Sequence, residues 1–145
     1  MKLNTRVRYG MRALLDIACH GTQEPVRLRD VAKRQGISEQ YLEQLILPLK
    51  GAGIVRSMRG ARGGFTLGKD PSEIKVSAVF EALGGAVSLT DCLTDSMVCS
   101  RTEDCVTREL WREINAAIKG VLASKTLQDL LERELRRNQQ PERAG

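Results

Sequence analysis

The chain has 145 residues, a length that suits one domain or a small domain with an added oligomerisation element. Charged residues make up 28% of it and aromatic residues 3%, which favours an aliphatic, helical core over a β-sandwich. The net charge of +5 is compatible with a nucleic-acid partner. No run approaches the roughly 18 apolar residues that a membrane span needs, and Arg6, Arg8 and Arg12 interrupt the region where a signal peptide would be apolar. We therefore expect a cytoplasmic protein with no membrane partner.

Helical periodicity predicts three helices in the first half of the chain. The first covers residues 4–20, and the second starts near Leu28 and stops at Gly36. The third follows Ser38, a residue type that caps helix N-termini. Pro48 lacks the backbone N–H that a helix interior needs, so it should kink or end the third helix. The apolar stripe of that helix is Leu42, Leu45, Ile46 and Leu49.

The second half begins with a predicted hairpin, since short strands at 54–57 and 65–67 flank a turn rich in glycine and arginine. A fourth helix is expected over 76–83, a long amphipathic helix over about 107–123, and a last helix capped by Thr126 before a polar, frayed end. The expected fold is mainly α with a small β-hairpin wing. Its units are residues 1–83, a cysteine-bearing loop at 84–106, the long helix at 107–125, and the last helix with its tail at 126–145.

A short helix, a turn at Gly36 and a second helix with a polar outer face form a helix-turn-helix pattern, and the hairpin that follows makes it a winged helix. The polar side chains on the outer face of the second helix are of types that read base edges in a major groove. Arg59 and Arg62 at the hairpin tip are suited to a minor groove or to phosphates. Tyr41 lies at the border of the apolar stripe, where packing and DNA contact are both open. A solvated helix face beside an ordinary turn explains each part separately, but the combination favours DNA. The expected outward side chains are Ser38, Glu39, Gln40, Glu43 and Gln44.

Three of the four cysteines, Cys92, Cys99 and Cys105, lie in the aperiodic loop with the spacing C-x₆-C-x₅-C. A loop can curl so that three thiolates converge, and thiolates suit iron–sulfur clusters, zinc or copper(I). A zinc site completed by a carboxylate, a thiol–disulfide switch and unrelated free thiols stay open as alternatives. Cys19 is expected to be a small buried residue, and His20 a partner of the helix C-terminus.

The chain resembles the family of winged-helix regulators that includes IscR, NsrR and CymR. The resemblance spans nearly the whole chain. It is carried by the segments MKLNTRVRYGMRALLDIA, ISEQYLEQLILPLKGAGIV, SMRGARGGFTLGKDPSEI, LWREIN and TLQDLL, together with the cysteine loop.

The resemblance implies a homodimer that binds double-stranded, palindromic operator DNA, with the helix at about 107–123 as the dimerisation helix. Carried over by motif position, Tyr41, Glu43 and Gln44 would lie in the major groove and Arg59 in the minor groove. The cysteine loop would hold an iron–sulfur cluster near the partner's first helix. IscR-like members repress genes of cluster assembly, and CymR-like members lack the cysteines and respond through a partner enzyme. A 2Fe–2S cluster is favoured, with 4Fe–4S as the alternative.

The chain departs from the IscR-like pattern at the fourth cluster ligand. IscR-like members carry a histidine two or three positions after the third cysteine, whereas Cys105 here is followed by Val-Thr-Arg108. NsrR-like members take an aspartate from the partner's first helix, where this chain has Arg6-Val-Arg8. The local candidates are then carboxylates: Asp91, Asp95, Glu103, Asp104 and Glu109. Rival functions are direct thiol sensing of oxidants or nitric oxide, and a zinc-stabilised interaction module. An enzyme is not expected, because the sequence shows no combination of a nucleophile and a general base.

Overall fold

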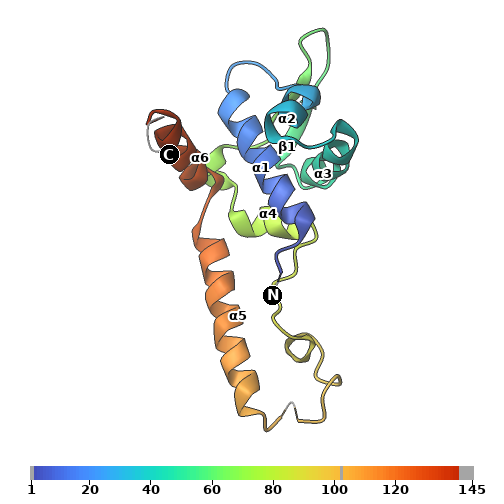
Figure 1. Ribbon diagram of the computed structural model, residues 1–145, viewed down its shortest axis with the longest axis vertical. Coiled ribbons are helices and arrows are strands. Elements are labelled where there is room, and N and C mark those ends of the chain that lie inside the picture. The colour runs from blue at the N-terminus through green and yellow to red at the C-terminus, as the bar shows by residue number, and fades with distance from the viewer. Residues whose placement is uncertain (1, 102, 141–145) are drawn as a thin grey trace.

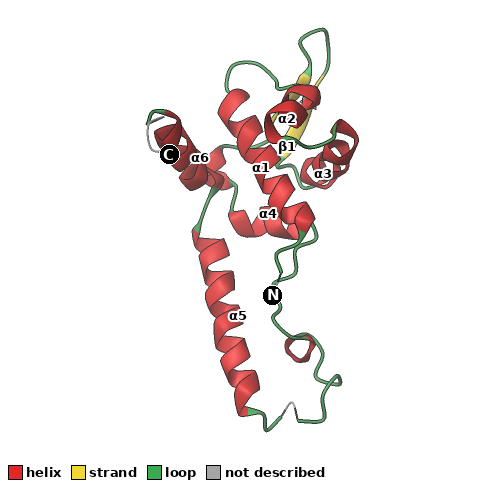
Figure 2. Ribbon diagram, viewed as in Figure 1, coloured by secondary structure: helices red, strands yellow, loops and turns green. Residues whose placement is uncertain are grey.

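The computed structural model describes residues 2–101 and 103–140. A winged-helix body occupies one end of the molecule, and helix α5 (Val106–Ser124) projects away from it (Figure 1). The loop that follows α4 (Val76–Ala82) runs alongside α5 in the view of Figure 1 and returns at its far end to begin that helix. The fold is mainly helical with one two-stranded antiparallel sheet, as the sequence predicts (Figure 2).

Helix α1 (Thr5–His20) is the centre of the core. The Asn4 side chain accepts the Arg6 N–H at 2.8 Å and so caps its N-terminus. Helices α2 (Leu28–Gln35) and α3 (Glu39–Gly51) pack against α1, and their apolar faces meet in one aliphatic cluster. The fully buried side chains of this cluster include Val7, Leu14, Ile17, Val31, Leu42, Leu45 and Leu49.

Helix α3 does not end at Pro48 but continues to Gly51. Proline at this position removes one hydrogen bond to the preceding turn, yet its own carbonyl still accepts the Ala52 N–H at 3.0 Å. Leu49 is fully buried directly after it, so core packing holds the last turn together despite the missing donor.

Strands β1 (Val55–Met58) and β2 (Gly64–Leu67) pair antiparallel, with Val55 opposite Leu67 and Met58 opposite Gly64. The first strand begins one residue later than expected. Ile54 immediately before it is 3% exposed and belongs to the core instead. The hairpin therefore starts from a buried anchor and extends outward as a wing.

The rest of the chain ties α5 to the body. A short 3-10 helix, η1 (Pro71–Glu73), precedes α4, and a second, η2 (Asp91–Leu93), interrupts the long loop. Helix α6 (Leu127–Asn138) begins with a capping box formed by Thr126 and Asp129. The backbone before α6 pairs with the backbone before α4, since Leu127 N–H donates to the Ile74 carbonyl at 2.8 Å. Part of the expected frayed tail falls on residues 141–145, which lie outside the described residues.

No helix among the described residues is both long and apolar enough to cross a membrane.

Candidate nucleic-acid interface and cysteine centre

The outward face of α3 is polar and open to solvent. Ser38 precedes the helix as its N-cap, and its Oγ accepts the Tyr41 N–H at 3.2 Å. Gly36 supplies the left-handed turn before it, with φ of 64°. All five side chains expected to face outward are exposed: Ser38, Glu39, Gln40, Glu43 and Gln44.

Tyr41 lies between this face and the core. It is half-buried, and its ring meets the Tyr9 ring of α1 edge to face, with centroids 6.1 Å apart and planes at 85°. The Arg12 guanidinium lies 5.3 Å from the centroid of the Tyr9 ring. Packing against α1 is therefore one established role of Tyr41, and it fixes the first turn of α3 relative to α1.

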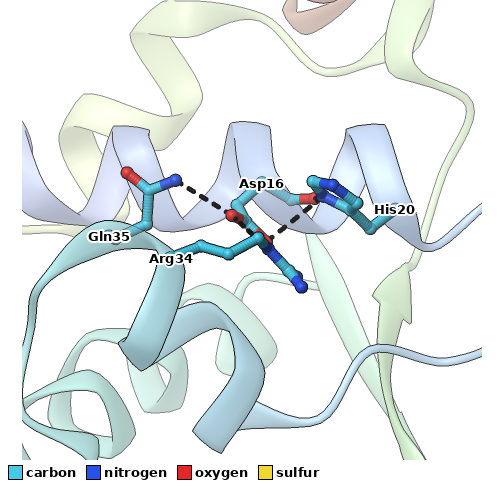
Figure 3. A network of polar contacts seen from close by, with 4 residues as sticks. All are labelled: Asp16, His20, Arg34 and Gln35. Carbon is cyan, nitrogen blue, oxygen red and sulfur yellow. Dashed lines mark hydrogen bonds and ion pairs between the residues drawn. The ribbon is translucent and has the colours of Figure 1, made fainter.

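A buried acid joins α1 to the last turn of α2 (Figure 3). Asp16, with 1% of its side chain exposed, accepts hydrogen bonds from Arg34 Nη2 at 2.6 Å and from Gln35 Nε2 at 2.9 Å. The bond to Asp16 raises the pKa of Arg34. His20 Nδ1 lies 2.9 Å from the Asp16 carbonyl oxygen, one turn along α1, consistent with its expected place at the helix end.

Arg12 extends this connection toward the helix-turn-helix. Its Nη2 donates to the Gln35 backbone carbonyl at 2.7 Å. That carbonyl belongs to the last residue of α2, directly before the Gly36 turn. Side chains of α1 thus hold both the side chains and the backbone at the entry to the turn.

The wing carries both arginines that the sequence singled out. Arg59 and Arg62 are exposed at the tip, and the turn closes where Gly63 N–H donates to the Gly60 carbonyl at 2.9 Å. Arg62 Nη1 lies 3.7 Å from Glu24 Oε1, both side chains being mostly exposed. Screening by water keeps this pair weak.

The three loop cysteines do not meet in this structure. Among the described residues, no three side chains of His, Cys, Asp or Glu lie close enough together to hold a metal ion. Cys92 lies within η2 and Cys105 is the N-cap of α5, while Cys99 is exposed between them. The convergence expected from their spacing stays a prediction.

Local contacts nevertheless suit thiolate chemistry at the two outer cysteines. Thr90 Oγ1 lies 3.0 Å from Cys92 Sγ, and Thr107 Oγ1 lies 3.1 Å from Cys105 Sγ. The Thr107 hydroxyl and the first backbone N–H groups of α5 lower the pKa of Cys105. A metal-bound thiolate has no proton, so each threonine would then be the donor. The donor set thus fits an iron–sulfur cluster or another thiophilic metal.

The position three residues after Cys105 is occupied by an arginine with a different role. Arg108 donates from Nε and Nη2 to the Cys92 carbonyl at 3.2 and 3.1 Å, which ties the loop to the first turn of α5. A guanidinium stays protonated in proteins and has no lone pair for a metal. Arg108 therefore connects two of the cysteines but supplies no ligand.

Cys19 is not a candidate ligand within its own chain. It lies near the C-terminal end of α1, about 20 Å along the helix from the end nearest the cysteine loop (Figure 1). Burial raises the pKa of its thiol. The sequence predicts a buried residue here, whereas Cys19 is half-buried and packs against the edge of the core.

Residues 3–133 match the model of the Rrf2 family, described as iron-dependent transcriptional regulators. The chain belongs to the Rrf2 family. It is 44% identical over 131 residues to protein rrf2 of Nitratidesulfovibrio vulgaris, covering 90% of this chain and 87% of that protein. It is also 44% identical to the HTH-type transcriptional regulator IscR of Serratia proteamaculans, covering 90% of this chain and 79% of that protein.

The solved structure of CymR, the global cysteine regulator of B. subtilis, has the same fold. It superposes with a TM-score of 0.78 at 38% identity, covering 92% of this chain and 98% of that one. These Rrf2-family relatives are transcriptional regulators, so the predicted winged-helix fold, the family and the absence of enzymatic function are confirmed. This Rrf2-family member is likewise a DNA-binding transcriptional regulator.

Sequence reasoning missed the residues that support the interface from behind. Asp16 and Arg12 on α1 hold the end of α2, and Arg27 and Glu24, before α2, contact the wing. A charged residue inside an apolar helix stripe was the available signal for Asp16. For Arg12, Arg27 and Glu24, the sequence spacing does not indicate which distant residues they contact.

Proposed function

We propose that the chain is a homodimeric repressor that binds palindromic operator DNA and whose affinity is set by an iron–sulfur cluster on Cys92, Cys99 and Cys105. The observation that carries the proposal is the cysteine loop itself. Three cysteines lie outside the core, in a loop that ends at the N-cap of α5, in a chain closely similar to regulators named IscR. By the same similarity, genes of cluster assembly are the proposed targets.

In this proposal α3 enters the major groove, because its polar face is the exposed one. Gln44 is suited to pair with adenine, and the Glu43 carboxylate accepts from cytosine while repelling groups that present acceptors. Arg59 at the wing tip would reach the adjacent minor groove. Two such units on a symmetric dimer require half-sites about one helical turn apart, or slightly more.

Dimerisation is proposed through α5. A soluble helix with an apolar stripe needs something to cover it. Four large apolar side chains on α5 are between 39% and 77% exposed: Val106, Leu110, Ile114 and Val121. Beside them an apolar cavity of about 420 Å³ lies between the N-terminal segment and α5, lined by residues that include Leu3, Phe80 and Ile118. A second copy of the chain would cover the stripe and adjoin this cavity.

The loop and α5 provide a route from the cysteines to the DNA-binding unit. Cys105 begins α5, and the far end of α5 is held to the start of α4, where Val76 N–H donates to the Lys125 carbonyl at 3.0 Å. Helix α4 in turn contacts α1 and α3. Closing the loop around a cluster would act on the start of α5, and thereby on the spacing of two DNA-reading heads.

A bound cluster would supply redox chemistry and lability to oxidants. We favour 2Fe–2S, with 4Fe–4S as the alternative. An oxygen ligand holds iron less firmly than thiolate or imidazole, so a carboxylate in the fourth place would make the cluster labile. The carboxylates near the cysteines are Asp91, Asp95, Glu103, Asp104 and Glu109.

The test is an optical spectrum with iron and sulfide assays on protein isolated without oxygen. We expect coloured protein that loses its cluster when Cys92, Cys99 or Cys105 is replaced by Ala, while Cys19→Ala keeps it. Operator affinity with and without the cluster is then compared by footprinting. Colourless protein with stoichiometric zinc, or bleaching by Cys19→Ala, would refute this assignment of ligands.

A thiol-based regulator of the same fold is the second candidate. The lowered pKa of Cys105, together with its position at a helix N-terminus, favours it. In that case colourless, metal-free protein would change its operator affinity on oxidation, and the change would depend on Cys105.

A further inference from the structure

The segment between α1 and α2 lies against the wing. Val26 N–H donates to the Phe65 carbonyl and Phe65 N–H donates to the Val26 carbonyl, both at 2.8 Å. Val26 is 6% exposed, so this edge of the hairpin is anchored in the core. A Cβ at Gly64 would lie 2.5 Å from the Val26 oxygen, and the close approach therefore requires glycine there.

The next residue, Arg27, reaches further along the wing. Its Nη2 donates to the Ala61 carbonyl at 2.8 Å, across 34 positions of sequence. Ala61 lies beyond the last strand pair, Met58 with Gly64, at the centre of the tip. Ala61 directly precedes Arg62 and lies two residues after Arg59, so Arg27 holds the backbone that carries both arginines.

The tip needs such support, because little else holds it. Residues 59–62 are all exposed, and Gly60 has φ of 114°, a conformation open to glycine alone. A glycine-rich turn that is ordered only on binding loses conformational entropy at that moment. A turn already held in the free protein avoids most of that cost.

We propose that Arg27 is a positioning residue for the wing, which holds the Ala61 backbone so that the tip arginines meet DNA in a preset geometry. The inference rests on the proposed function, in which the tip contacts DNA. The acceptor is a neutral carbonyl, so the Arg27 charge is not cancelled and adds to the positive potential at the tip. Arg27 acts through Arg59 and Arg62 and not through a phosphate of its own.

A double-mutant cycle tests this mechanism. Arg27→Met removes the donor and keeps most of the side-chain volume, in the natural chain and in a tip variant carrying Arg59→Ala and Arg62→Ala. We expect operator affinity to fall about three- to ten-fold in the natural chain, the net size of one ordinary protein hydrogen bond, and less than about two-fold in the tip variant. Arg29→Met, an equal loss of charge on exposed α2, should have the same effect in both backgrounds.

The opposite pattern would overturn the proposal. If Arg27→Met costs the same factor in both backgrounds and lowers the slope of log K against log salt by about 0.9, Arg27 itself contacts a phosphate. Hydrogen exchange of the Gly63 amide in the DNA-free protein gives an independent readout. Arg27→Met should accelerate exchange of the Gly63 amide. An unchanged exchange rate would refute the claim that Arg27 orders the wing tip. A tip variant that binds as tightly as the natural chain would instead refute the proposed wing contact, and with it the role of Arg27 in binding.

Discussion

The Asp16 carboxylate, almost fully removed from water, lies 2.6 Å from the Arg34 guanidinium and so joins the C-terminal half of α1 to the last turn of α2. The same acid accepts from Gln35, the last residue before the turn of the helix-turn-helix. A buried charge without its partner is costly, so this pair is sensitive to the loss of either side. The pair connects α1 to the first helix of the helix-turn-helix.

Asp16→Ala should destabilise the fold by about 2–3 kcal/mol, less than for a fully buried pair because a third of the Arg34 side chain meets solvent. Urea unfolding measures the effect. Asp30→Ala is the matched control, since Asp30 is an exposed acid one turn before Arg34 and should cost at most about 0.5 kcal/mol. Equal costs for the two variants would mean that burial of Asp16 contributes nothing.

Glu24→Gln should increase operator affinity about two- to five-fold at low salt. The substitution removes a carboxylate that lies 3.7 Å from Arg62 and that would also face DNA phosphates. Binding titrations at two ionic strengths provide the check, since the gain should vanish at about 0.5 M salt, where the Debye length falls to a few ångströms. Weaker binding would instead show that Glu24 orders Arg62 for its contact.

Ile114→Glu on α5 should convert the proposed dimer to a monomer, because a charge in the centre of a shared apolar stripe cannot be hydrated. Sedimentation at micromolar concentration measures the change. Leu135→Glu is the matched control, since Leu135 on α6 is 45% exposed and Ile114 is 39% exposed. If both variants keep the oligomeric state of the natural chain, the interface lies elsewhere.

In metal-free, reduced protein, Cys105 should be alkylated faster than Cys19 at pH 7–8. The pKa of Cys105 is lowered by its contact with Thr107, which increases the reactive thiolate fraction, whereas burial raises the pKa of Cys19 and decreases it. Thr107→Val should raise the pKa of Cys105 toward its ordinary value and slow its alkylation about two- to five-fold. Mass spectrometry after timed iodoacetamide treatment resolves the two sites.

Arg108→His should slow the loss of the proposed cluster, because imidazole binds iron and a guanidinium does not. The half-life of the visible absorption in air measures retention. Arg108→Leu removes the same bonds to the Cys92 carbonyl without adding a ligand, and should shorten the half-life. A histidine variant that bleaches as fast as the leucine variant would place the open iron site out of reach of position 108.

The sequence by itself determined the order of the helices, the caps that begin α3 and α6, the turn after α2, and the exposed face of α3. These depend on local chemistry: apolar spacing, the Ser38 and Thr126 caps, and the Gly36 turn, each acting within a few residues. Helix α3 continues past Pro48 because packing of Leu49 outweighs one lost donor, and packing is invisible to a local rule.

Only the tertiary structure decided how the helix-turn-helix and the wing are held in place. The bonds from Arg34 to Asp16 and from Arg27 to Ala61 join positions 18 and 34 residues apart. The second ends on a backbone carbonyl, which every residue has, so no sequence pattern marks it. Arg108 is a similar case. It stands at the distance after Cys105 where IscR-like members carry a ligand histidine, but its contact is with the backbone carbonyl of Cys92. Sequence spacing limits which residues can come into contact. Which of these contacts form is decided by the free energy of burial and hydrogen bonding in the packed molecule.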